Sequence, residues 1–191
     1  SNDQLKDYRH NEKNHILVIC NILGNHVAHK EFKYCFNEHF FNNCGLLQLQ
    51  KEYNKEIIIK LKSRTNEKGY KHNISYLDKI LPKGLKYKIL IDVEDDNKLI
   101  SESFMVISAP STLTFKPIQL QIPTAVIKDS GQNGLFYDFK GFTNLNSGEI
   151  ITILKDQLVS PDLDFINNTI EGGDNFNSPN VFVNNLKQML L

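Results

Sequence analysis

The sequence contains no tryptophan and only three cysteines in 191 residues. An odd number of cysteines does not make a closed disulfide framework. Two thiol states fit: one disulfide with one free thiol, or three reduced thiols buried in the core. A chain of this length can bury a core without disulfides. The three cysteines, Cys20, Cys35 and Cys44, therefore do not decide between an oxidising and a reducing compartment.

The sequence also lacks an excess of charge of one sign and a long apolar run. Lys and Arg total 22, and Asp and Glu total 22, so the formal net charge is zero. Balanced charge gives no uniform field to attract nucleic acid, and we predict no nucleic-acid partner. No apolar run reaches the roughly 18 residues of a membrane-spanning helix. Residues 1–14 are polar, so we expect neither a signal peptide nor a transmembrane segment.

Motifs that carry catalysis are missing as well. The sequence has no Gly-x-Ser-x-Gly elbow, no phosphate-binding loop, no His-Glu-x-x-His and no dinucleotide fingerprint. This absence is the main support for two predictions, that the protein is not an enzyme and that it binds no cofactor.

What the sequence does contain is a series of short runs with strand character. They are rich in β-branched and aromatic residues and are separated by turn residues. Their spacing of roughly 10–14 residues is typical of an all-β sandwich. We predict seven strands within 15–23, 29–41, 45–53, 55–63, 70–80, 85–93 and 98–108.

The segment Leu81-Pro-Lys-Gly-Leu-Lys-Tyr87 carries a family resemblance. Pro82 and Gly84 predict a turn into a strand that begins near Leu85. Tyr87 is placed for a tyrosine corner, in which the hydroxyl bonds to upstream backbone. With Leu81 six residues before this Tyr, the segment resembles fibronectin type III and related immunoglobulin-like domains. The resemblance implies an antiparallel β-sandwich over about 15–108 that serves adhesion or partner binding.

The domain prediction follows from these patterns. We expect a flexible tail over 1–14, an immunoglobulin-like sandwich over 15–109, and an α+β extension or second small domain over 110–191. Pro117 predicts that the run 113–122 is an edge strand or a bulge. Another short strand is expected at 135–142, and helices are expected at about 147–160 and 179–191.

Three clusters are candidate sites. Zinc-ligand residue types gather at His26, His29, Cys35, His39 and Cys44, but their spacing matches no standard zinc motif. A structural role is the favoured interpretation, so no metal site is expected. If a metal site exists, the candidate ligands are Cys35, His39 and Cys44. A Cys–His nucleophile pair is a further alternative.

The second cluster is acidic. Asp92, Glu94, Asp95, Asp96 and Asn97 predict a solvated hairpin turn, with a calcium site shared with 171–174 as the alternative. The third cluster is aromatic and consists of Phe136, Tyr137, Phe139 and Phe142, with Tyr34 and Phe36 earlier in the chain. Tyr137, Phe139 and Phe142 are the candidate binding residues, and the alternative is that the rings belong to the core.

The functional prediction is a non-enzymatic interaction or structural module of a larger secreted, envelope or surface-assembled system. Its partner would be another protein, and its location would be extracytoplasmic. The alternatives are a carbohydrate- or lipid-binding domain that uses the aromatic residues, and a metal- or thiol-dependent enzyme that uses the His/Cys cluster.

Overall fold

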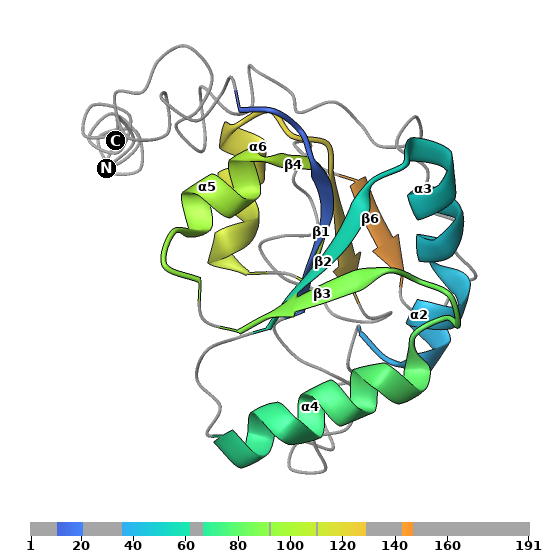
Figure 1. Cartoon of the computed structure of the whole chain (residues 1–191). Helices are drawn as coiled ribbons and strands as arrows, with labels where there is room; N and C mark the ends of the chain where they lie inside the picture. The colour runs from blue at the N-terminus through green and yellow to red at the C-terminus, as the bar shows by residue number, and fades with distance from the viewer. Residues whose placement is uncertain are drawn as a thin grey trace, which may run out of the picture.

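The computed structural model describes residues 11–20, 36–61, 67–91, 93–109, 111–128 and 143–146. Figure 1 shows that these residues form one sheet with helices on both of its faces. In chain order the elements are β1 (His15–Cys20), α2 (Glu38–Asn43), α3 (Leu46–Tyr53), β2 (Glu56–Leu61), α4 (Glu67–Ile80), β3 (Tyr87–Leu90), α5 (Asp96–Ser101), β4 (Ser103–Ser108), the short 3₁₀ helix η1 (Thr112–Thr114), α6 (Phe115–Gln119), β5 (Thr124–Lys128) and β6 (Thr143–Asn146).

The six described strands lie in the order β3-β2-β1-β4-β5-β6, and every neighbouring pair is parallel. At the centre, Ile16 of β1 lies opposite Ile57 of β2 and Met105 of β4. This order is that of the doubly wound, Rossmann-like α/β fold. The predicted antiparallel sandwich is therefore wrong, and so is the immunoglobulin-like or fibronectin-like resemblance that implied it. β5 and β6 lie beyond residue 109 and extend the same sheet.

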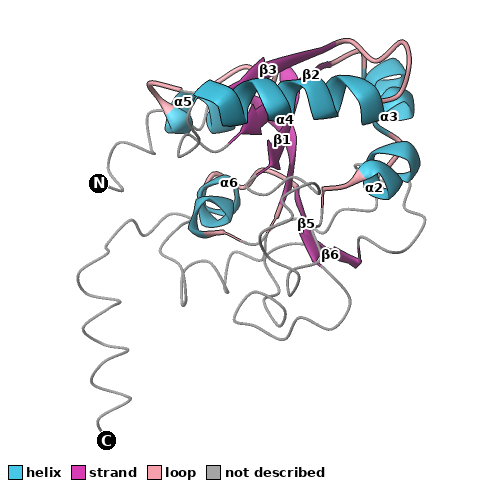
Figure 2. Cartoon of the chain, turned by 90° about the horizontal axis from the view of Figure 1, so that it is seen from below, coloured by secondary structure: helices cyan, strands magenta, loops and turns pink. Residues whose placement is uncertain are grey.

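The central strands are apolar on both faces, because helices cover both faces of a parallel sheet. All six residues of β1 are buried. Ile16 and Val18 point into a core shared with α2, α3 and α4, which we call the α2–α4 core. Leu17 and Ile19 point into a second core shared with α5 and the segment after α6, which we call the α5–α6 core. Figure 2 shows the two groups of helices from below.

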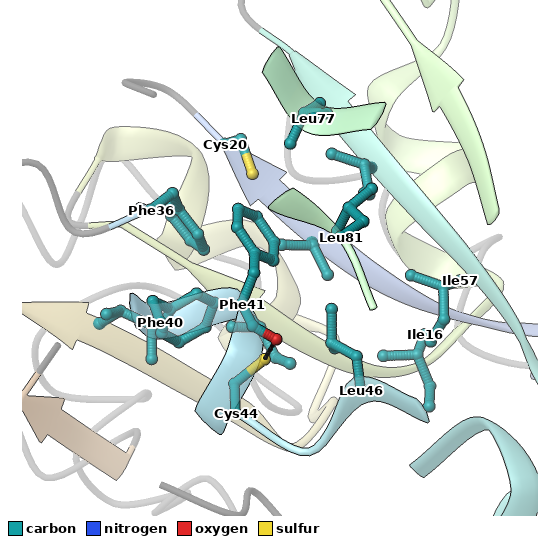
Figure 3. Packing of buried hydrophobic residues seen from close by; sticks show 14 of the residues in the cluster. Ile16, Cys20, Phe36, Phe40, Phe41, Cys44, Leu46, Ile57, Leu77 and Leu81 are labelled. Carbon is teal, nitrogen blue, oxygen red and sulfur yellow. Dashed lines mark hydrogen bonds between the residues drawn. The ribbon is translucent and has the colours of Figure 1, made fainter. Parts of the chain in front are cut away.

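Three phenylalanines occupy the middle of the α2–α4 core (Figure 3). The Phe40 ring lies edge-on to Phe36, with 5.1 Å between centroids, and edge-on to Phe41 at 5.3 Å. α2 can start beside them because the Asn37 side chain caps it by accepting a hydrogen bond from the Phe40 N–H at 2.9 Å. Leu77 and Leu81 approach the cluster from α4 and the residue after it.

Two of the predicted strands are helices, and the described end of a third, the run 29–41, enters helix α2 at Glu38. The run 45–53 is α3, where Leu46 and Leu49 are buried one turn apart. The run 70–80 lies in α4, where Leu77 and Ile80 are buried. Both pairs have the three-residue spacing of a helix face, and this period decides the structure although the residues also suit a strand. The run 98–108 is divided between α5 and β4, and Pro117 lies in the first turns of α6, where its missing N–H costs no helical hydrogen bond.

The Leu-Pro-Lys-Gly segment connects α4 to β3. The Leu85 N–H donates to the Pro82 carbonyl at 3.2 Å, and Gly84 has φ +87°, a conformation that glycine adopts without steric cost. The Tyr87 hydroxyl donates to Asp78 Oδ1 of α4 at 2.7 Å, and this bond raises the pKa of Tyr87 to about 12. The tyrosine therefore ties a helix to an edge strand of a parallel sheet, and no sandwich corner is involved.

The entry into β3 is held by a side chain of α3. The Gln50 amide accepts from the Lys86 N–H at 2.8 Å and donates to the Lys86 carbonyl. Both backbone groups of Lys86 are therefore bonded within the molecule.

Candidate functional site

The topology singles out one place on the sheet. Since the six described strands are all parallel, their carboxyl ends lie at one edge of the sheet, which we call the carboxyl edge. From β1 the chain proceeds outward to β2 and β3, and from β4 it proceeds outward to β5 and β6. The order reverses between Cys20, the last residue of β1, and Ser108, the last residue of β4. Ligands of open α/β sheets bind at such a switch point.

The turn after β4 is shaped by three hydroxyl groups. Ser108 and Thr114 are fully buried, and their side-chain oxygens lie 3.0 Å apart. Both hydroxyls donate to the Ala109 carbonyl, at 2.8 and 3.1 Å. Ser111 Oγ lies 3.3 Å from Thr114 Oγ1 and is only half-buried. The buried pair therefore fixes the backbone of the turn, while Ser111 remains accessible at its tip.

The start of α5 lies at the same edge, because α5 follows β3. Asp95 caps the helix by accepting from the Lys98 N–H at 3.0 Å. Asp96 pairs with Lys60 near the end of β2, with 3.3 Å between Oδ1 and Nζ. The Lys116 ammonium of α6 donates to Asn97 Oδ1 at 2.8 Å. These bonds join α5 to β2 and to α6, so three neighbouring elements are connected at the carboxyl edge.

This arrangement corrects the interpretation of the acidic segment. Glu94 and Asp95 lie between strand β3 and helix α5, and Asp96 and Asn97 are the first residues of α5, so the acidic segment does not form a hairpin turn. Asp95 is a helix cap, and Asp96 and Asn97 are engaged by lysines, which gives three of the proposed calcium ligands structural roles. Asp92 and residues 171–174 lie outside the described residues.

Two of the three thiols are buried in the α2–α4 core. Cys20 ends β1 and Cys44 follows α2 as its C-cap. Burial raises the pKa of Cys20 well above its ordinary value, and it raises the pKa of Cys44 to about 12. Cys44 Sγ contacts the Phe41 carbonyl at 3.7 Å (Figure 3). Both are free thiols in the structure, and protonated buried thiols are poor nucleophiles.

We expect these two thiols to be unreactive in the native protein. In a Cys35→Ser variant, the only remaining thiols are Cys20 and Cys44. At pH 8 and a pKa of about 12, roughly one Cys44 in ten thousand is a thiolate. Labelling with a chromogenic disulfide reagent should therefore be negligible in buffer and complete in urea. Rapid labelling of either thiol in the folded protein would contradict the buried placement.

The candidate metal ligands do not come together among the residues described. His39 is exposed on α2, where its carbonyl accepts from Asn43 Nδ2 at 2.7 Å. Cys44 is buried on the inner side of the same segment. No group of three His, Cys, Asp or Glu side chains that could hold a metal occurs within the described ranges. Cys35, His26 and His29 lie outside those ranges, and so do the candidate binding residues Tyr137, Phe139 and Phe142.

A groove of about 630 Å³ lies elsewhere, between the α2–α3 junction and Pro82. Its lining includes the apolar residues Phe41, Leu46 and Leu47 and the charged residues Lys51 and Glu52. Pro82 precedes β3, and Lys51 and Glu52 precede β2. These lining residues therefore lie before the amino ends of strands, whereas the switch point lies beyond the carboxyl ends. The groove is therefore separate from the switch point.

Sequence reasoning missed Ser108, Ser111 and Thr114. The available signal was local: a buried apolar run, Met105-Val-Ile107, is followed at once by small hydroxyl residues. That signal has meaning only when the run is known to be a central parallel strand. Among the described residues, no helix is long and apolar enough to span a membrane. Comparisons of the chain with family models, with curated proteins and with solved structures find no match.

Proposed function

We propose that the chain is a small-molecule-binding domain that holds a mononucleotide, or a metabolite linked to one, at the carboxyl edge between β1 and β4. The observation that carries the proposal is the strand order with its single reversal between these strands. Crevices outside the carboxyl ends of strands at such a reversal bind nucleotides in doubly wound folds. Many unrelated functions share this strand order, so the test below probes the carboxyl edge itself.

The chemistry of the β4 turn supports this location. Ser108 and Thr114 use their hydroxyls within the turn and are fully buried, so they pre-organise it rather than contact a ligand. Ser111 is half-buried and can offer its hydroxyl to a phosphate or a ribose oxygen. A rigid turn that presents one accessible hydroxyl lowers the entropic cost of binding a polar ligand.

The sequence after β1 favours a mononucleotide over a dinucleotide. Dinucleotide-binding domains use a Gly-x-Gly-x-x-Gly loop at this point, where the glycines let the backbone approach the pyrophosphate. Gly24 is the only glycine among residues 21–35. The chain therefore lacks the loop that would hold the pyrophosphate of NAD or FAD.

Calorimetric titration with a panel of mononucleotides, with NAD as a comparison, tests the proposal. We expect at least one mononucleotide to bind, and Ser111→Phe to weaken that binding by about tenfold or more, because the ring occupies the tip of the β4 turn. The matched control is Glu102→Phe, which places the same ring at the other end of β4 on a partly exposed position. The control should bind like the wild type.

Two results would overturn the proposal. One is that no mononucleotide in the panel binds while the protein is folded. The other is that Ser111→Phe and Glu102→Phe weaken binding equally, since that would separate the ligand from the carboxyl edge.

The interaction module, the carbohydrate- or lipid-binding domain, the thiol or metal enzyme and the extracytoplasmic location stay predictions. The sandwich that motivated the interaction module is absent, so a site defined by the parallel sheet is now the better-supported starting point.

A further inference from the structure

The end of α5 is held by the segment that precedes β1. Residues 11–14, which we call the N-terminal strap, cross this end. Asn11 Nδ2 donates to Ser101 Oγ at 2.7 Å, and the Lys13 ammonium donates to the Ser101 carbonyl. The Asn14 N–H donates to the Glu102 carbonyl at 2.8 Å. The last carbonyls of a helix have no intrahelical partner, so the strap satisfies groups that would otherwise need water.

His15 completes this capping from inside the protein. The residue is 4% exposed, and its Nε2 lies 3.0 Å from the Leu99 carbonyl and 3.1 Å from Ser103 Oγ. Ser103 Oγ also lies 3.1 Å from the Leu99 carbonyl, to which it donates. A carbonyl can only accept, so the neutral ring carries its proton on Nε2. His15 and Ser103 thus share the carbonyl of Leu99 near the end of α5.

A second proton would place a charge in this buried position. Glu56 at the start of β2 and Glu102 at the end of α5 favour the charged ring, and Lys13 of the strap opposes it. Glu56 also pairs with Lys88 of β3, at 3.1 Å. Lys55 sits beside the site and donates to the Lys13 carbonyl at 2.6 Å. Burial outweighs the favourable carboxylates and the Leu99 carbonyl, and it lowers the pKa of His15 from its ordinary value of 6.5.

We propose that His15 is a proton-operated latch: the neutral ring holds the end of α5 and the N-terminal strap against the sheet, and protonation releases both. The released state solvates the charged ring, which the closed state cannot do. This inference does not depend on the proposed ligand. Release of α5 would also affect the carboxyl edge. The helix has six residues, which is about 9 Å, and its other end bears Asp96 and Asn97.

The direction of the pH dependence follows from linkage. In the closed state the pKa of His15 is lowered, so between that value and 6.5 the open state binds more protons than the closed state. The latch is therefore fully closed above about pH 6.5 and weakens as the pH falls through this window. Each unit of difference between the two pKa values corresponds to about a tenfold change in the opening equilibrium.

Hydrogen exchange tests the latch by comparing wild type with His15→Gln at the same pH, so that intrinsic exchange rates cancel. Glutamine places an N–H donor near Nε2 but does not titrate. At pH 7.5 we expect similar protection of residues 11–14 and 98–103 in both proteins. At pH 5 we expect the wild type to exchange there about tenfold faster than the variant, with no difference in β1 or β2.

The matched control is His72→Gln, because His72 is exposed on α4 and lies far from the strap in the chain. It should follow the wild type at both pH values. Equal acid-induced loss of protection in wild type and His15→Gln would overturn the proposal.

If His15→Gln does not fold, a pH titration of the wild-type protein followed by NMR of the His15 ring carbons tests the latch instead. The proposal requires that the His15 resonance titrate below 6.5 and that the amides of Asn14 and Ser101 shift with the same midpoint. A midpoint at or above 6.5, or amides that do not follow it, would refute the latch.

Discussion

Replacing Phe41 with alanine is expected to lower the free energy of unfolding by about 3–5 kcal/mol, which is a large part of the stability of a domain of this size. Phe41 is fully buried at the centre of the α2–α4 core. Its ring packs on Phe40 at 5.3 Å and on Phe36 at 6.0 Å between centroids. Truncation therefore removes buried apolar area and leaves a cavity beneath α2 that the neighbouring strands cannot fill. Urea unfolding, followed by far-UV circular dichroism, measures the change.

Two further variants serve as comparisons for the destabilisation expected from Phe41→Ala. Phe41→Leu keeps most of the volume and should cost clearly less, since part of the cavity is filled. Phe115→Ala removes the same group from a half-buried position at the start of α6 and should cost less than half as much. If Phe41→Ala and Phe115→Ala destabilise equally, then Phe41 is not at the centre of a packed core.

The second large effect is expected at Thr114. Thr114→Val keeps the shape of the side chain but removes a hydroxyl that contacts the Ala109 carbonyl, Ser108 Oγ and Ser111 Oγ at 3.1, 3.0 and 3.3 Å. Thr114 and Ser108 are fully buried, so water cannot replace the lost bonds without opening the turn. We expect a loss of about 1–3 kcal/mol in the free energy of unfolding, measured by urea denaturation.

Thr114→Ser is the matched variant, because it keeps the hydroxyl and loses only a methyl group, worth about 0.8 kcal/mol when buried. Thr124→Val provides a comparison at a buried threonine whose hydroxyl makes one bond, to the Ile122 carbonyl at 2.8 Å. It should cost less than Thr114→Val. A Thr114→Val protein as stable as the wild type would show that the three hydroxyls do not act together.

Three strands, from the centre of the described sheet to one of its edges, could be predicted from the sequence. The runs 15–23 and 55–63 contain β1 and β2, and the run 85–93 contains β3. Their β-branched residues and bounding turns carry that information locally. The direction of each strand does not appear in such patterns. A fully buried run fits a parallel strand as well as a sandwich strand, and this ambiguity led to the wrong architecture.

The sequence contains a signal for helices α3 and α4 that the strand prediction did not use. In 45–53, Leu46, Leu49 and Tyr53 recur at spacings of three and four, which is a helical period. In 70–80, Ile74, Leu77 and Ile80 recur at spacings of three, which also fits one face of a helix. Counting these matches against strict alternation would have favoured helices between the strands. A strand–helix alternation then predicts a parallel sheet.

The candidate site could not be predicted from the local patterns that indicate strands and helices. Ser108 and Cys20 are 88 positions apart in the chain, and they reach the same edge of the sheet only because β4 pairs with β1, where Ser108 lies opposite Ile19, the residue before Cys20. That pairing is decided by the packing of whole layers. The hydroxyls after β4 gain their significance from the strand order, which no local pattern contains.

The amide of Gln50, docked on the backbone of Lys86, bears on how the molecule behaves at high concentration. An edge strand exposes N–H and C=O groups on which a foreign chain can begin to pair and from which aggregates can grow. β3 is such an edge, but it is only four residues long, and the donor and acceptor at its entrance are occupied by the molecule's own side chain. A protein molecule that collides with this edge therefore finds few free groups with which to start an intermolecular sheet.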